Sequence, residues 1–235
     1  MSDQDWTTEL REFATLKPRK SLAQEAADTL REFILLGKLS AGQAVPEREL
    51  AQAFGISRTP LKEALRMLET EGLIVYSATR RPSVADPSLR QINEWLRVQG
   101  ALEALAGELA CEVATDTEIA EIEKANLAIG QQPGCDDPLE SFKRDMTFHT
   151  AIVEAARNTS LAETHASYNA RLWRVRFLSS QRTSGREATI REHRNIIEAL
   201  KARKPRSARI ALRQHLRTAE TNIAAALAER SSLST

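Results

Sequence analysis

Several hallmarks of secreted and membrane proteins are missing from this sequence. Its 235 residues include only two cysteines, Cys111 and Cys135, without CxxC spacing. Two separate thiols are therefore expected rather than a disulfide. No apolar run approaches the roughly 20 residues that a membrane-spanning helix needs. The opening stretch MSDQDWTTEL is acidic and lacks the charged-then-apolar order of a signal peptide. These absences favour a cytoplasmic protein with no membrane partner.

The sequence also lacks a strong charge imbalance and is poor in aromatic residues. Its formal net charge is +1, and aromatic residues make up 5% of the chain. The total charge therefore does not indicate a nonspecific binder of polyanions, and the local distribution of charge matters more. With 42% hydrophobic and 28% charged residues, the composition is that of a globular protein, and the length suits two domains.

Helical signals dominate the first part of the chain after residue 20. Apolar residues repeat there at helical spacing: Leu22, Ala26, Leu30, Phe33 and Ile34. Pro46 suits the first turn of a second helix, which Gly55 can end. Ser57 can cap a third helix that ends near Gly72. We therefore predict three short helices in this region.

The pattern changes after these helices. Two short strand-like runs, residues 73–76 and a stretch around Val84, are joined by a basic tip and read as a hairpin. Three helices and a two-stranded wing make a winged helix-turn-helix. We predict this domain at residues 20–86, preceded by an N-terminal tail at residues 1–19.

The rest of the chain shows helical periodicity alone. Helices are expected at 89–114, 116–130, 138–156, 160–180, 186–203 and 206–230. The breaks between them contain Pro133, Gly134, Pro138, Gly185 and Pro205. We predict an all-α helical bundle at residues 87–230 and a C-terminal tail at 231–235. The predicted fold class is thus mainly α, with an N-terminal winged helix-turn-helix and a C-terminal bundle.

The stretch LAQAFGISRTPLKEAL has the organisation of a DNA-reading motif. A tight turn at residues 55–57 leaves Arg58, Thr59 and Lys62 near the start of the third helix, where side chains can enter a major groove. Backbone N–H groups there also favour a phosphate. A capped amphipathic helix with solvated cations would explain the same pattern. The wing arginines Arg80 and Arg81 favour DNA binding instead.

The segment PERELAQAFGISRTPLKEALRMLETEGLI resembles the DNA-binding domain of the GntR superfamily of bacterial transcription regulators. The resemblance covers about residues 20–85 and implies a double-stranded DNA operator as partner. It places six residues on the family's DNA-contact positions: Arg48, Ser57, Arg58, Thr59, Lys62 and Arg80. It further implies that Arg48 and Lys62 hold phosphates, whereas Arg58 and Thr59 reach base edges.

Two positions depart from that family pattern. Lys62 stands where arginine is common, which disfavours bidentate reading of guanine. The wing tip reads Thr79-Arg80-Arg81, where the family often has Gly-Arg-Gly. Without the glycines the backbone cannot approach the minor groove in the same way. We expect a wing that grips the DNA backbone by charge.

All four histidines lie in the predicted bundle: His149, His165, His193 and His215. Asp145 and His149 are four residues apart on one helical face, an arrangement that suits a metal, a ligand, a catalytic couple or a simple hydrogen bond. His193 lies eleven residues before Lys204, and His215 lies eleven residues after it. In a helical hairpin that turns near Lys204, both imidazoles lie at the same level, roughly 16 Å from the turn.

Three imidazoles and one carboxylate that converge in a bundle suit Zn²⁺ or a similar divalent ion. A lone buried histidine is more often an ordinary core residue. The stretches DMTFHTAIVEAARN, EH at 192–193 and HL at 215–216 resemble the C-terminal effector (FCD) domain of the FadR-like branch of the superfamily. That resemblance implies four metal ligands, which are Asp145, His149, His193 and His215. Zn²⁺ is the expected metal, with Ni²⁺ or Mn²⁺ as alternatives.

The same resemblance covers about residues 90–220 and implies a small carboxylate effector. Gln99 stands where an arginine often precedes Leu102-Glu103, which removes one expected cationic contact. Arg97 could replace it, or the effector could be less acidic. His165 lies on an apolar stripe and is expected to line the core or the pocket. A run of cations follows, formed by Arg171, Arg174 and Arg176. Its pattern predicts a solvated helix face, from which one arginine could reach into the pocket.

The expected function is a ligand-responsive transcription regulator that acts as a homodimer, because one winged helix reads only a short half-site. A metal-dependent hydrolase is a competing hypothesis, since such a site can activate water. The sequence contains no HExxH motif and no separate general base with an orienting partner, which argues against an enzyme. A third hypothesis is a DNA-binding protein whose metal is purely structural.

Overall fold

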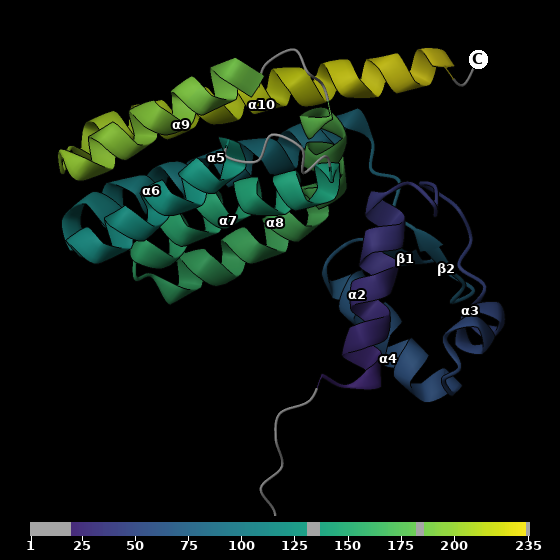
Figure 1. The fold of residues 1–235 in the computed structure, drawn as a ribbon. Helices are drawn as coiled ribbons and strands as arrows, with labels where there is room; N and C mark the ends of the chain where they lie inside the picture. The colour runs from purple at the N-terminus through teal and green to yellow at the C-terminus, as the bar shows by residue number, and fades with distance from the viewer. Residues whose placement is uncertain (1–19, 131–136, 182–185, 234–235) are drawn as a thin grey trace, which may run out of the picture.

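The computed structural model describes residues 20–130, 137–181 and 186–233. Within these ranges the chain forms nine helices, α2 to α10, and one two-stranded sheet. A small winged domain lies at one end of a long helical bundle (Figure 1). This mainly α architecture confirms the predicted fold class. No helix of the described ranges is long and apolar enough to cross a membrane. The predicted tails and Cys135 lie outside these ranges, apart from residues 231–233, which continue the last helix.

The winged domain has the predicted order of elements. They are α2 (Leu22–Leu35), α3 (Glu47–Phe54), α4 (Arg58–Thr70), β1 (Ile74–Tyr76) and β2 (Pro82–Val84). The strands pair antiparallel, with Ile74 opposite Val84. Gly55 ends α3 with a φ of 64°, a left-handed conformation that glycine adopts without steric strain. Leu61, Leu65 and Leu68 of α4 are fully buried in a core that α2 and the wing complete.

Some local details differ from the sequence prediction. Pro46 is the N-cap of α3 and lies just before its first turn. Ser57 occupies the N-cap position of α4, but its side chain makes no capping hydrogen bond. Leu22 and Phe33 share the helical spacing of α2 and are nevertheless 58% and 43% exposed, because Ala23 and Ala27 fill the buried face instead.

The bundle consists of six helices. They are α5 (Leu89–Val113), α6 (Asp116–Gly130), α7 (Pro138–Ala155), α8 (Thr159–Ser180), α9 (Arg186–Lys201) and α10 (Pro205–Leu233). Side-chain caps set several of their starts. Ser88 and Gln91 form a capping box at α5, and Asn158 accepts a hydrogen bond from the backbone N–H of Leu161 at α8. Asn158 therefore acts as the N-cap of α8.

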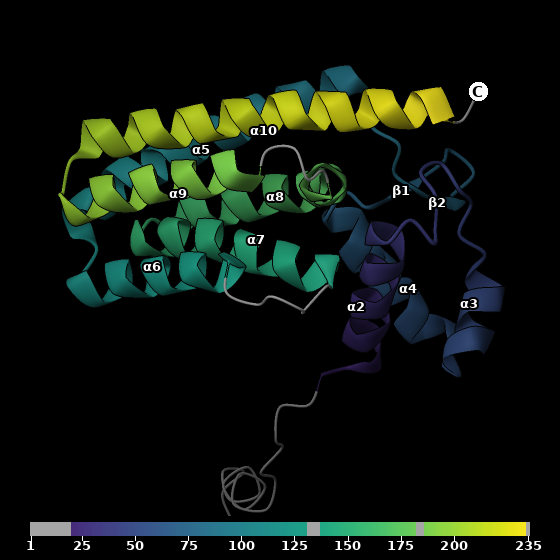
Figure 2. The same cartoon turned by 45° about the horizontal axis from the view of Figure 1, so that its top comes forward.

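Helices α9 and α10 lie side by side as an antiparallel hairpin, with α5 behind α10 (Figure 2). A glycine permits the close packing of α5 against α10. A Cβ atom built on Gly107 would overlap Cδ1 of Leu212, so a larger residue would displace the Leu212 side chain or α10 itself. This packing fixes the level at which residues of α5 and α10 meet inside the bundle.

The two domains share a small apolar contact. Leu35, in the last turn of α2, is buried among side chains of α7 and α8, namely Leu139, Phe142, Met146 and Phe177. Beside this cluster, Lys143 of α7 donates to Glu32 of α2 at 2.9 Å. Helix α7, which carries Asp145 and His149, therefore contacts the winged domain directly.

Candidate metal centre and nucleic-acid interface

The six residues with the family's DNA-contact positions are all exposed on the winged domain: Arg48, Ser57, Arg58, Thr59, Lys62 and Arg80. In the described part of the chain, none of the four cations among them forms an ion pair. By contrast, Arg31 on the opposite side binds Glu71 and Asp28 at 2.6 and 2.7 Å. The first-turn N–H groups of α4 have no side-chain cap, so they remain available to an oxygen of DNA.

The wing tip turns without the family's glycines. Arg80 takes a φ of 56°, a left-handed conformation that costs a residue with a Cβ atom about 1 kcal/mol. Hydrogen bonds across residues 77–81 hold the turn, including Arg80 N to Ser77 O at 2.8 Å and Arg81 N to the Ser77 hydroxyl at 3.1 Å. The tip is thus a tight turn that projects an exposed arginine.

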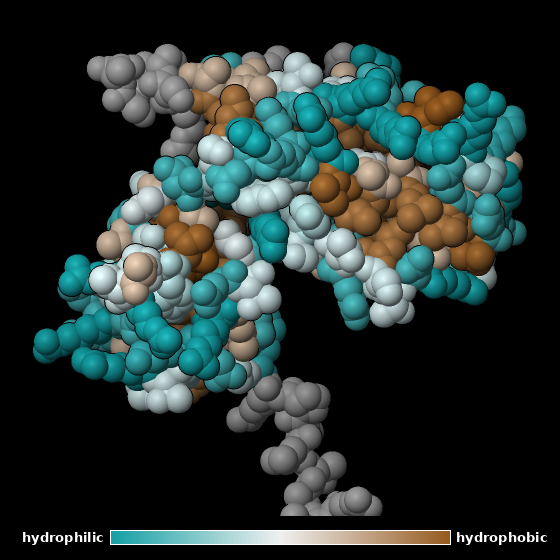
Figure 3. All heavy atoms as spheres, turned by 180° about the vertical axis from the view of Figure 1, so that it is seen from behind, coloured by the Kyte–Doolittle hydropathy of each residue, from teal (hydrophilic) through white to brown (hydrophobic). Residues whose placement is uncertain are grey.

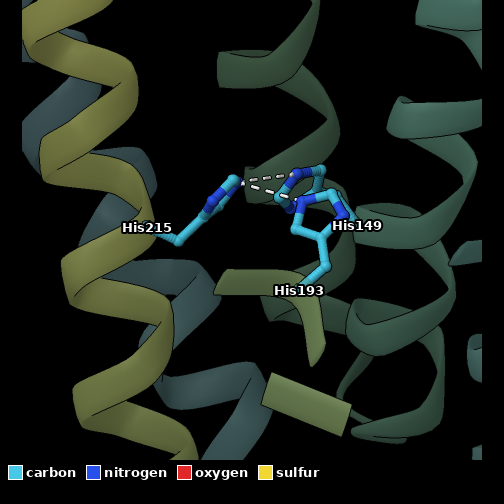
Figure 4. A group of neighbouring side chains, drawn as sticks. All are labelled: His149, His193 and His215. Carbon is cyan, nitrogen blue, oxygen red and sulfur yellow. Dashed lines mark hydrogen bonds between the residues drawn. The ribbon is translucent and has the colours of Figure 1, made fainter. Parts of the chain in front are cut away.

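Three of the four histidines meet inside the bundle. His149 of α7, His193 of α9 and His215 of α10 are buried, and their rings point toward one another (Figure 4). Nε2 of His215 lies 3.4 Å from Nε2 of His193 and 3.3 Å from Nε2 of His149. The equal spacing of His193 and His215 from the α9–α10 turn therefore produced the predicted convergence.

An oxygen atom holds the outer nitrogen of each ring. Nδ1 of His149 lies 2.8 Å from Glu103 of α5, and Nδ1 of His215 lies 2.9 Å from Glu192 of α9. Nδ1 of His193 lies 3.0 Å from the amide oxygen of Asn126 of α6. Carboxylate and amide oxygens only accept hydrogen bonds, so each Nδ1 carries the proton that it donates.

This arrangement assigns the tautomer of all three rings. Because each proton sits on Nδ1, the three Nε2 atoms present lone pairs to one another and cannot form hydrogen bonds among themselves. Protonation of His193 does not supply the missing donor, because burial and the neighbouring His215 and His149 lower the pKa of His193 well below its usual value. Three buried lone pairs aimed at one point could hold a cation. The Nδ1 contacts are the outer hydrogen bonds that metal-bound histidines commonly make.

The two spacings measured from Nε2 of His215 match those around a small divalent ion. Zn–N bonds of 2.0–2.1 Å in a tetrahedral site place neighbouring nitrogens about 3.3–3.4 Å apart. The carboxylate of Asp145 lies beside the group, at 4.0 Å from Nε2 of His149 and 3.7 Å from Nε2 of His193. Its side chain is 22% exposed, so it lies toward the solvent side of the three rings.

A second buried group surrounds Glu103 next to the histidines. Its carboxylate receives hydrogen bonds from His149 at 2.8 Å, Gln99 at 3.2 Å, His165 at 3.4 Å and Arg176 at 3.5 Å. Burial alone would raise the pKa of Glu103, but its interaction with His149, the hydrogen bond from His165 and the charge of Arg176 hold that pKa well below its usual value. Glu103 is therefore a carboxylate at neutral pH. With these contacts, each of the six bundle helices contributes to the joint site.

The residues predicted for effector binding have different environments. Gln99 and His165 are buried in the Glu103 group, at 0% and 2% exposure. Arg97 is exposed on α5, so the structure does not bring it to this group. Arg171 packs over the rings of Trp95 and Tyr168, at 5.9 and 5.5 Å, and against Gly72 of the winged domain.

Sequence reasoning missed several polar residues of the site. Of the three arginines, Arg176 is the one that reaches inward: it is 6% exposed and donates to Asn169 as well as to Glu103, and the sequence did not indicate which of the three would do so. Asn126 and Glu192 were not among the predicted site residues, because each partner of a histidine Nδ1 atom comes from another helix. Glu103 carried a signal: it lies four residues after Gln99 on the buried stripe of α5.

Comparison with known families agrees with both parts of the fold. Residues 22–81 match the bacterial regulatory proteins of the gntR family, and residues 94–218 match the FCD domain. A winged helix joined to this bundle defines a DNA-binding transcription regulator. The chain belongs to the FCD-domain family, and its first part is a DNA-binding domain of the gntR family.

Several regulators are similar over most of the chain. The HTH-type transcriptional regulator YdhC of Bacillus subtilis is 28% identical over 77% of this chain and 81% of its own length. The HTH-type transcriptional repressor RspR of Escherichia coli is 27% identical over 86% of this chain and 88% of its own. These relatives regulate transcription and are not enzymes, in agreement with the sequence prediction.

Solved structures share the fold. The E. coli protein McbR/YncC superposes with a TM-score of 0.73 at 23% identity, covering 90% of this chain and all of that protein. A GntR regulator from Rhodococcus superposes with a TM-score of 0.72 at 21% identity, covering 88% of this chain and 99% of the other. The arrangement of winged domain and bundle is thus a shared architecture.

Proposed function

We propose that this regulator binds its operator as a homodimer in the cytoplasm and senses a small carboxylic acid at a divalent metal site in the bundle. The observation that carries the proposal is the set of three buried Nε2 lone pairs. Each ring is fixed by an oxygen at Nδ1, and among the described residues no hydrogen-bond donor serves these lone pairs. Such a set is suited to hold a cation.

The metal ligands in this proposal are His149, His193, His215 and Asp145. Zn²⁺ is the best match for imidazole nitrogens at this spacing, and Ni²⁺ or Mn²⁺ are alternatives. When bound, such an ion supplies positive charge and a coordination position for a carboxylate oxygen. The protein contributes the rigid orientation of the rings through Glu103, Asn126 and Glu192.

DNA binding is assigned to the winged domain. Arg48, Lys62 and Arg80 are unpaired surface cations that would hold phosphates. Arg58 and Thr59, in the first turn of α4, would contact base edges in the major groove. Serine at position 57 starts that helix and leaves its N–H groups open to a phosphate.

A homodimer is supported by the exposed face of α5. Val98, Leu105 and Val113 follow one another along this helix and are 38–42% exposed. Helix α5 lies at the back of the bundle in Figure 1, and the view from behind shows a broad hydrophobic area on the bundle (Figure 3). Apolar surface of this kind marks an interaction site. Two-fold pairing there would present two winged domains to a symmetric operator.

Coupling between sensing and DNA binding has a physical route. Helix α7 carries Asp145 and His149, and one turn earlier it carries Phe142 and Lys143, which contact α2 of the winged domain. A ligand that shifts α7 would therefore act on the winged domain. Linkage requires that an acid which weakens DNA binding tenfold must itself bind tenfold more weakly to the DNA complex.

Metal analysis of the full-length protein tests the site. His215→Ala should lower the bound metal well below one ion per chain. His165→Ala is the matched control, because His165 is equally buried but its ring contacts Glu103 outside the Nε2 group. Equal metal content in both variants and the parent would overturn the proposed site.

Titration of simple carboxylic acids, with and without operator DNA, tests the switch. Acid binding should require the metal and should differ between free and DNA-bound protein. Metal without acid binding would leave a DNA-binding protein with a structural ion.

A further inference from the structure

A cavity lies between the winged domain and the bundle. It encloses about 640 Å³, within the range usual for small-molecule sites, which often form where two domains meet. Leu73 and Val84 at the base of the wing line it from the winged domain, and Ile92 of α5 and Val175 of α8 line it from the bundle. None of the four proposed metal ligands belongs to this lining. The cavity is therefore a separate candidate site for a molecule that contacts both domains.

The lining of the cavity is largely apolar. Ile34, Val84 and Ile92 are at most 2% exposed, so side chains from the cores of both domains form part of its wall. Helix α10 adds only small or aliphatic side chains there, including Ala224 and Ala228. A wall of this kind favours an apolar molecule, because binding removes the apolar surface of both partners from water.

Arg171 of α8 brings a positive charge to this apolar cavity. Its stem packs on the winged domain, since a Cβ atom built on Gly72 would lie 2.7 Å from Cγ of Arg171. Its guanidinium carbon lies 5.9 and 5.5 Å from the ring centres of Trp95 and Tyr168. Among the residues that the structure describes, no carboxylate forms an ion pair with Arg171. The aromatic rings thus hold this guanidinium in place without neutralising it.

The charges of the lining select the sign of a ligand. The guanidinium groups of Arg171 and Arg174 and the carboxylate of Asp86 line the cavity, which leaves one positive charge. Asp86 is exposed to solvent, so its charge is screened more than that of a group inside the cavity. One acidic group on an apolar molecule would neutralise the excess. An uncharged molecule of the same shape would remove water from Arg171 without replacing its hydrogen bonds.

We propose that this interdomain cavity binds a small apolar anion with one acidic group, which pairs with Arg171. Gly72 and Leu73 come just after α4, the helix assigned to the major groove, and residues 84–87 lead from the wing to α5. A molecule bound between these segments and α8 stabilises one placement of the winged domain on the bundle. The chain therefore has a second input to DNA binding, which does not require the metal.

Calorimetric titration of the full-length protein with 2-naphthoate and with 2-naphthylmethanol tests the site. The two molecules share the naphthalene rings, and only the first carries a negative charge. The acid should bind at one site per chain and roughly tenfold more tightly than the alcohol, as a charged hydrogen bond provides. Its affinity should stay the same after chelation of the metal. It should also differ between free and DNA-bound protein, because the two binding events are linked.

Three variants assign the binding to the cavity. Arg171→Met keeps an apolar stem and removes the charge, so it should lower the affinity for 2-naphthoate about tenfold and leave the affinity for the alcohol unchanged. Ala228→Phe fills the cavity from an exposed position of α10 and should remove the binding of both molecules. Arg213→Met removes an exposed arginine of α10 that lies outside the lining, and as the control it should change neither affinity.

The outcomes separate this proposal from the metal site. Equal affinities for the acid and the alcohol in the parent protein would overturn it, and so would unchanged binding of the acid in folded Ala228→Phe protein. Loss of acid binding in chelated protein with unchanged circular dichroism would place the acid at the metal centre and would also overturn it. Equal affinities for free and DNA-bound protein would overturn the effect on DNA binding. Binding that survives chelation would support the cavity even if the metal site takes no acid, so the two proposals fail independently.

Discussion

The winged domain and the bundle bury different kinds of side chain. Within residues 20–86 every buried side chain is apolar. All buried polar or charged side chains of the described chain belong to the bundle: Gln99, Glu103, His149, His165, Asn169, Arg176, His193 and His215. The winged domain thus keeps its functional groups outside a dry core, whereas the bundle places them inside. Exposed functional groups suit contact with a large partner outside the domain, whereas buried groups suit a small partner that the bundle encloses.

Removing the buried negative charge should have the largest effect. Glu103→Gln leaves Arg176 without a counter-charge in the bundle, and breaking a buried pair in this way costs about 3–5 kcal/mol. Urea denaturation should show a loss of that order in the free energy of unfolding. Glu94→Gln is the control on the same helix, because its ion pair with Arg90 is exposed. Similar losses in both variants would contradict a special role for the buried charge.

A cavity in the apolar core of the winged domain should lower the stability of that domain alone. Leu65→Ala removes a fully buried side chain from the winged domain and should destabilise it by about 2–5 kcal/mol. DNA affinity should fall in gel-shift or anisotropy titrations, while the metal content stays at the parental value. Loss of metal in this variant would show that the two cores are not independent.

In protein treated with a chelator, the pH dependence of the unfolding free energy should differ between the bundle and the winged domain. Burial lowers the pKa of His193 and of His149 in the folded state, so the unfolded chain binds more protons below about pH 6.5. Stability of the bundle should therefore fall as pH drops from 6.5 to 5, by at most about 1.4 kcal/mol per pH unit for each histidine.

The winged domain should not respond in that window. Its Asp28 has a pKa of about 2, held there mainly by a hydrogen bond from Lys20, so that contribution is lost only as pH falls from about 4 to 2. Fluorescence of Trp95 and Trp173, both in the bundle, follows that domain in a protein whose third tryptophan, Trp6, is replaced by phenylalanine. Circular dichroism of the chain follows both. A bundle that is equally stable at pH 7 and pH 5 would exclude neutral buried histidines.

The smallest effect on stability is expected at the wing tip. Arg80→Gly relieves the left-handed φ but adds freedom to the unfolded chain, so the unfolding free energy should change by less than about 0.5 kcal/mol. DNA affinity should fall, and the slope of log K against log salt should decrease by about one. An unchanged slope would mean that Arg80 contacts no phosphate.

Most of the fold, but only part of the candidate site, could be predicted from the sequence. Caps, prolines and glycines near residues 46, 55, 57 and 205 marked helix ends because they act locally. The equal spacing of His193 and His215 from their turn gave the convergence, since helix rise is constant. The partners of those rings all come from other helices, and no local rule relates Asn126 to His193. The sequence could not say which of Arg171, Arg174 and Arg176 reaches inward, because burial of Arg176 depends on Glu103, 73 residues away.

Leu35 and Glu32 bear on how interchangeable the parts of this regulator are. Both belong to the first helix of the DNA-reading domain, yet Leu35 completes an apolar cluster of the bundle and Glu32 binds Lys143. A domain transplanted from another regulator would expose Phe142 and Met146 unless its own first helix ended with an apolar residue and an acid three positions before it. This contact between the domains therefore limits which winged domains can be combined with this bundle. The two domains are expected to be inherited together and are best engineered as a pair.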